Sequence, residues 1–100
     1  MNILVPMDSE EVQEAKIVPV FEVKKWAMLV VEEGELVEVT HQTNREDFEA
    51  WAEAVVVMND NEPVGNFIDE QIMVLVAHTQ RSIDDIVEAY LFRELHELAY

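Results

Sequence analysis

Unbroken apolar runs mark the second half of the chain. Residues 54–58 and 72–77 are continuously apolar, without the alternation of a strand that is half exposed to water. Such runs are typical of parallel strands covered by helices on both faces. The polar segment 61–70 between them carries Pro63 near its start, where the first turn of a helix tolerates a missing amide hydrogen. The pattern therefore predicts a right-handed strand–helix–strand unit.

A longer amphipathic segment follows the second apolar run. Ser82 stands at the position of a helix N-cap, where its hydroxyl can accept a hydrogen bond from a free backbone amide. Apolar side chains recur after it at helical spacing and form one stripe. They are Ile83, Ile86, Val87, Tyr90, Leu91, Leu95 and Leu98. We predict a long final helix.

The first half of the chain favours strands. Residues 2–7 form a short apolar run that predicts a first strand. Residues 26–31 and 35–41 flank a turn with Gly34 at the position that needs a positive φ. In the second arm, alternation places Val37, Val39 and His41 on one face and Leu36, Glu38 and Thr40 on the other. This half-polar pattern predicts a hairpin whose second arm lies at a sheet edge.

Two connecting segments complete the chain. Residues 8–25 form a stretch longer than the usual connection, and such loops often lie over a binding site. Asn44 is a possible cap for a helix over residues 45–53. Its buried side would carry Phe48, Trp51 and Ala52. Both Trp26 and Trp51 are expected in the core.

The order of these elements predicts one domain over residues 1–100. Hairpin contiguity places the third strand beside the second and the second beside the first, and the two crossover units extend the sheet on the other side of the first strand. We predict a three-layer α/β domain with three helices. Its five-stranded mixed sheet has the order 3-2-1-4-5, with strand 2 antiparallel to the rest, which is the ribonuclease H-like arrangement.

Three stretches resemble a known family. Residues 1–8 are similar to its opening strand, residues 26–37 to its acidic hairpin with Glu33-Gly34-Glu35 at the bend, and residues 82–91 to its final helix. The chain thus resembles the dinitrogenase iron–molybdenum cofactor biosynthesis family, the NifX-like domains that carry or process metal-cluster precursors. The resemblance implies an accessory domain without enzymatic activity, with an iron–sulfur or iron–molybdenum cluster as its cofactor.

The chain departs from this family at two functional positions. Family members commonly carry His-Phe-Gly-Arg after the first loop, whereas residues 20–23 here are Val-Phe-Glu-Val. They also carry glycines after the fourth strand, which let backbone approach a bulky ligand, whereas residues 59–61 are Asn-Asp-Asn. The usual cluster-binding His is therefore absent. A second interpretation stays open, namely a cluster-free protein-interaction or regulatory module with an acidic surface.

Charge and composition exclude several classes of function. Six Lys and Arg against 22 Asp and Glu give a net charge of −16, which repels nucleic acids and anionic membranes and favours a protein partner with a basic surface. No apolar run reaches the roughly 20 residues that span a bilayer. The chain has no Cys, so disulfides, thiolate nucleophiles and Cys-bound clusters are excluded. Without a signal-peptide pattern at the N-terminus, we expect a cytoplasmic protein.

Polar side chains follow three neighbouring strands of the predicted sheet. Asp8, Asn59 with Asp60, and His78 come directly after the first, fourth and fifth strands. Ligands of open α/β sheets bind beyond these carboxyl ends. We therefore predict a cofactor-binding site of these four residues under the 8–25 loop, with His78 as the metal ligand. Binding through an imidazole should weaken below about pH 6.5. The alternative is that the acids are ordinary turn residues.

Other constellations are weaker. His41 and His78 fall at opposite edges of the predicted sheet, roughly 19 Å apart at about 4.8 Å per strand, so they cannot share a metal. His96 is expected on the surface of the final helix. Asp8 and Asp60 resemble a nuclease pair but lack further acids. With no phosphate-binding glycine pattern either, we expect no enzymatic activity.

Overall fold

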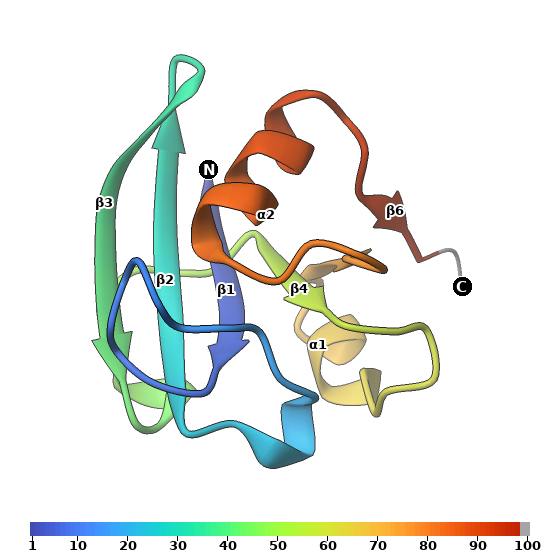
Figure 1. Cartoon of the computed structure of the whole chain (residues 1–100). Helices are drawn as coiled ribbons and strands as arrows, with labels where there is room; N and C mark the ends of the chain where they lie inside the picture. Colours follow the sequence, from blue (N-terminus) through green and yellow to red (C-terminus); the bar gives the residue numbers. More distant parts are fainter. Residues whose placement is uncertain (99–100) are drawn as a thin grey trace.

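Six strands form one mixed sheet in the order β3-β2-β1-β4-β5-β6 in the computed structural model, which describes residues 1–98 (Figure 1). β1, β3, β4 and β5 run in the same direction, and β2 and β6 run antiparallel to their neighbours. The strands are β1 Asn2–Met7, β2 Lys25–Glu32, β3 Glu35–Gln42, β4 Ala54–Val57, β5 Met73–Val76 and β6 His96–Glu97.

Helices and loops cover both faces of this sheet. Helix α2 (Ile83–Leu91) packs on one face with the first part of the 8–25 loop, through Ala15, Ile17 and Ile86. The short helix α1 (Gly65–Asp69) and the 3₁₀ turn η1 (Val20–Glu22) lie on the other face (Figure 1). The central apolar strands are therefore buried on both sides, as their continuous hydrophobic runs predict.

The sixth strand corrects the predicted sheet. The first five strands have the predicted order, but the prediction of five strands is wrong because β6 pairs antiparallel with β5. The final helix ends at Leu91, and two residues later Arg93 adopts the left-handed conformation with a φ of 58°. The Glu94 amide then bonds to the Ala89 carbonyl at 2.7 Å, and the Arg93 amide bonds to the Tyr90 carbonyl. This is the Schellman ending, which turns the chain back toward the sheet.

The predicted helix over residues 45–53 is also wrong. The structure has only a 3₁₀ turn, η2 (Arg45–Asp47), and the Asn44 side chain makes no capping hydrogen bond. Residues 48–53 instead follow an irregular course, in which the Asn2 side chain donates to the Trp51 carbonyl and the Asn2 amide donates to the Glu53 carboxylate, both at 2.9 Å. Trp51 is consequently 85% exposed instead of buried. Among residues 1–98 there are two α-helices, not three.

The β2–β3 hairpin keeps its predicted turn but not its predicted faces. Glu33 and Gly34 both have positive φ, as a tight hairpin turn requires. Val31 pairs with Leu36 and Val30 with Glu38, so Val37 is an extra residue that interrupts the alternation. Leu36 and Val39, predicted on opposite faces, therefore pack against the same core cluster, while Val37 is half exposed.

No helix among residues 1–98 has both the length and the apolar character needed to cross a membrane.

Candidate functional site

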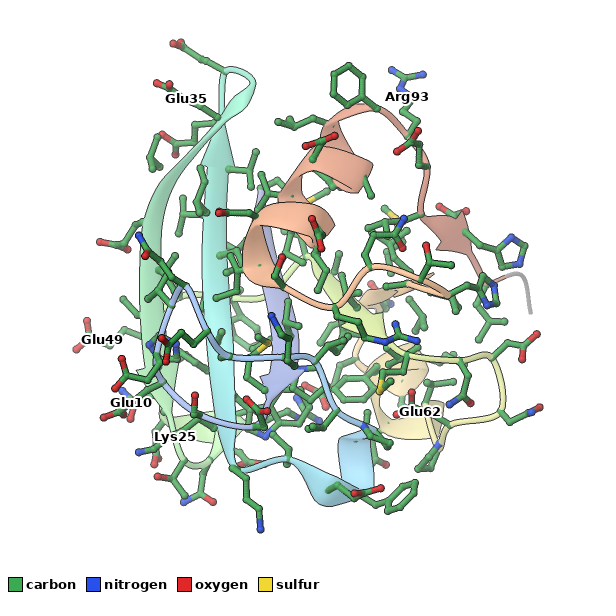
Figure 2. The ribbon with its side chains drawn as sticks, in the orientation of Figure 1. Glu10, Lys25, Glu35, Glu49, Glu62 and Arg93 are labelled. Atoms are coloured by element: carbon green, nitrogen blue, oxygen red, sulfur yellow. The ribbon has the colours of Figure 1, made fainter. Side chains whose placement is uncertain are left out.

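One buried carboxylate ties the loop after β1 to the carboxyl end of β4. Glu62, on the connection between β4 and α1, is only 7% exposed and lies inside the loops (Figure 2). Its Oε1 accepts a hydrogen bond from the Val20 amide at 2.6 Å. Its Oε2 accepts from the amides of Met58 at 2.7 Å and Asn59 at 3.1 Å. Glu62 thus joins the 8–25 loop to the end of β4.

Two of the polar side chains predicted at this edge accept hydrogen bonds from backbone amides of the following loops. Asp8 Oδ1 accepts from the Lys16 amide at 2.9 Å, and Asn59 Oδ1 accepts from the Asn61 amide at 3.0 Å. Asp60 and His78 are exposed. In the part of the chain that the structure describes, no three His, Asp or Glu side chains are grouped so that they could hold a metal ion. A binding site of Asp8, Asn59, Asp60 and His78 stays a prediction.

His78 has a neighbour that the sequence did not indicate. The rings of His78 and His96 lie with centroids 6.0 Å apart and planes inclined by 43°. The expectation that His96 sits on the final helix is wrong because β6 places it opposite Val76 at the edge of the sheet. His96 is exposed, as expected. The carboxyl end of β5 therefore presents two imidazoles.

Arg81 holds the backbone beneath this pair. Its guanidinium donates to the carbonyls of Ala77 at 3.2 Å, Gln80 at 2.8 Å and His78 at 2.9 Å. The Arg81 carbonyl in turn accepts from the Ile17 amide at 2.8 Å. Arg81 therefore holds the turn after β5 through its side chain and contacts the 8–25 loop through its backbone carbonyl.

His41 lies on β3, away from these groups, as predicted from the strand order. Its Nε2 is buried and forms no hydrogen bond with any of residues 1–98. Burial lowers the pKa of His41, and nearby Lys25 adds to this, while Glu10 acts in the opposite direction. Lys25 forms an ion pair with Glu10 at 3.5 Å, and both are seen beside β2 and β3 in Figure 2.

A concave surface lies on the α1 face of the sheet. Two adjoining hollows of about 340 and 360 Å³ share Met28, Phe48, Glu49 and Ala50, and we call them together the acidic groove. The exposed Trp51 lines one hollow. The remaining carboxylates on the walls are Glu38, Glu46, Asp47 and Glu70. This groove was not predicted, because it depends on the irregular course of residues 48–53, which were expected to be helical.

Arg45 is the cation on the wall of the acidic groove, and it is already engaged. Both of its terminal nitrogens donate to the Glu70 carboxylate, and its guanidinium lies 4.7 Å from the centre of the Phe67 ring. The hydrogen bond from Arg45 lowers the pKa of Glu70. The other carboxylates of the groove therefore give it a negative charge that Arg45 does not offset.

Comparison with known proteins supports the fold. No family model and no curated protein matches the chain. A crystal structure described as that of PH0822 has a TM-score of 0.75 at 14% identity, covering 98% of this chain and 96% of the other. A "putative dinitrogenase" from Methanocaldococcus jannaschii has a TM-score of 0.74 at 15% identity, covering 99% and 95%. The chain therefore shares the fold of these two proteins.

Proposed function

We propose that this chain is a small, non-enzymatic accessory domain of the NifX-like type that binds a metal cofactor at the carboxyl edge of its sheet. The imidazole pair of His78 and His96 carries the proposal, because it supplies nitrogen ligands at the end of β5. Fold likeness over nearly the whole chain supports it. So does the similarity of residues 1–8, 26–37 and 82–91 to NifX-like sequences.

This chain lacks the histidine that NifX-like sequences commonly carry after the first loop, so another strand end would have to supply the imidazole ligand. Val20 occupies the corresponding position, and its amide is bound by Glu62. The 8–25 loop is thus fastened to β4 at the place where the family would present an imidazole. His78 follows the strand next to β4 in the sheet, so the same edge still offers an imidazole.

Cluster uptake tests this proposal. Purified protein is titrated with a cluster-loaded donor, and visible absorbance is followed after separation from the donor. We expect stoichiometric uptake by the wild type and by His41→Ala, and loss of uptake in His78→Ala. Absence of uptake by the wild type would contradict the proposal.

The second candidate is a protein-interaction module, and the acidic groove favours it. Trp51 is 85% exposed beside the groove. Tryptophan is enriched among the residues that dominate binding energy at interfaces. Carboxylates around an apolar floor complement a partner that presents apolar side chains surrounded by Lys or Arg.

A synthetic peptide of alternating Lys and Leu residues tests this candidate through the fluorescence of Trp51. Glu46→Gln with Glu49→Gln should weaken binding strongly, because both carboxylates line the groove. Glu33→Gln with Glu35→Gln, at the hairpin turn, is the matched control with the same change in net charge. Equal weakening by both pairs would show attraction to the overall charge alone and would contradict a groove-specific interaction.

A further inference from the structure

We infer that His78 and His96 form a two-histidine site for a divalent transition-metal ion such as Zn²⁺, Ni²⁺ or Cu²⁺. The inference deepens the proposed function, since it names the ligands and the class of ion. The biological role of the site rests on the proposed function. Binding of the ion itself does not, because it is measured separately from cluster uptake.

The distance between the rings fits a shared ion. A metal about 2.05 Å from an imidazole nitrogen lies about 3.2 Å from the ring centroid, so two rings at a tetrahedral angle have centroids about 5.2 Å apart. The observed separation is 6.0 Å. The two exposed rings therefore need to approach by less than about 1 Å, which small rotations of their side chains provide.

The sheet places both side chains on one face. Val76 pairs with His96, and directly opposed residues of antiparallel strands point to the same side. His78 follows Val76 by two residues and so shares that side by alternation. The Ala77 amide donates to the Val57 carbonyl at 2.8 Å, which holds the residue before His78 beside β4.

The backbone on both sides of the pair is fixed. The Leu98 amide donates to the Val74 carbonyl at 2.9 Å, so β6 is held to β5 beyond its two paired residues. Arg81 donates to the carbonyl of His78 at 2.9 Å. The two imidazoles therefore project from anchored backbone, which lowers the entropy lost when an ion orders them.

The ligand chemistry selects the class of ion. Imidazole nitrogen suits Zn²⁺, Ni²⁺ and Cu²⁺, whereas Ca²⁺ and Mg²⁺ require sets of oxygen ligands. Since residues 1–98 contain no third His, Asp or Glu grouped with the pair, water would complete the coordination shell. Open positions of this kind leave an ion accessible to a further ligand. The net charge of −16 raises the local concentration of cations around the site.

Titration of the full chain with Zn²⁺ or Ni²⁺ tests the site. Isothermal titration calorimetry in excess Ca²⁺ measures affinity, because Ca²⁺ occupies the acidic surface and leaves imidazoles free. Ni²⁺ should selectively broaden the imidazole NMR signals of His78 and His96. His78→Ala and His96→Ala should each weaken binding roughly tenfold or more, about 1.4 kcal/mol at the tenfold limit. His41→Ala is the matched control and should bind as the wild type does.

Both histidines are exposed, so their substitution should leave the thermal unfolding transition nearly unchanged, and circular dichroism checks this. Wild-type affinity in either single variant, equal loss in all three variants, or complete competition by Ca²⁺ would overturn the inference. Ion binding that depends on the pair, without cluster uptake, would contradict the proposed function and leave this site standing. Cluster uptake together with an ion affinity that does not depend on His78 and His96 would support the proposed function and contradict the two-histidine site.

Discussion

The Glu62 carboxylate accepts a hydrogen bond from the backbone amide of Val20, which lies 42 residues earlier in the chain. Val20 stands where NifX-like sequences commonly have the first residue of their His-Phe-Gly-Arg stretch. At this position the chain therefore has a structural contact between the 8–25 loop and the end of β4. The contact is one of several hydrogen bonds that hold this long connection against the rest of the domain.

Glu62→Ala should lower the free energy of unfolding by about 2–4 kcal/mol, because it leaves the amides of Val20, Met58 and Asn59 without their acceptor. Urea denaturation measures the loss, and hydrogen exchange at the Val20 amide should accelerate. Glu35→Ala, at the exposed hairpin end seen in Figure 2, is the control and should change stability by less than about 0.5 kcal/mol. Equal effects of the two substitutions would contradict a structural role of Glu62.

His41 should make stability depend on pH. Burial lowers its pKa in the folded state, so below the ordinary imidazole pKa of about 6.5 the unfolded chain takes up the proton more readily. Stability is therefore full above that value and should fall as the pH decreases toward the lower folded pKa. Urea midpoints between pH 8 and pH 5 measure this effect. The decrease in stability should be smaller in His41→Phe, because a phenyl ring cannot take up a proton. An unchanged pH profile in this variant would contradict the prediction.

The two tryptophans should behave oppositely. Trp26 is 6% exposed and packs edge-on against Phe67 with ring centroids 6.0 Å apart, whereas Trp51 is 85% exposed. Trp26→Ala should cost about 3–5 kcal/mol of stability, and Trp51→Ser less than about 0.5 kcal/mol. Acrylamide should quench the fluorescence of Trp51, observed in Trp26→Phe, far more than that of Trp26, observed in Trp51→Phe. Similar quenching in the two variants would show that residues 48–53 cover Trp51 in solution.

The Arg45–Glu70 pair should be visible in the titration of Glu70. The hydrogen bond from Arg45 lowers the pKa of Glu70, so Arg45→Gln should raise that pKa toward its ordinary value. The side-chain carboxyl ¹³C chemical shift of Glu70 measures the titration. The stabilisation from the pair is present above the ordinary glutamate pKa and is lost as the pH falls through the lowered one. An unchanged pKa in Arg45→Gln would mean that the pair does not persist in solution.

Local patterns were sufficient to predict much of the fold. The apolar runs indicated β4 and β5, and the Ser82 hydroxyl accepts from the Asp85 amide as an N-cap should. Gly34 marked the hairpin turn correctly. The errors arose where tertiary contacts prevailed over local preference. Arg93 ends α2 in a conformation usually taken by Gly, and Asn2 donates hydrogen bonds to Trp51 and Glu53 where a helix was expected.

The candidate site likewise combines residues that local patterns could predict with residues whose positions depend on tertiary contacts. Asp8, Asn59, Asp60 and His78 could be assigned to strand ends because strands and their order follow from apolar runs and crossover rules. His96 could not be paired with His78, since its position depends on β6, a strand of two residues without a pattern of its own. Glu62 resembled any loop glutamate in the sequence. Its role depends on three backbone amides that come together only after folding.

The interruption of β3 at Val37 bears on self-association. An outermost strand with free backbone groups can template the addition of strands from other chains, and irregular pairing with charged side chains opposes this. Here the extra residue sits between Leu36 and Glu38, and Glu35 begins the strand. At the opposite border of the sheet, the outermost strand β6 is only two residues long. Both borders are thus poor templates for the growth of intermolecular β-structure.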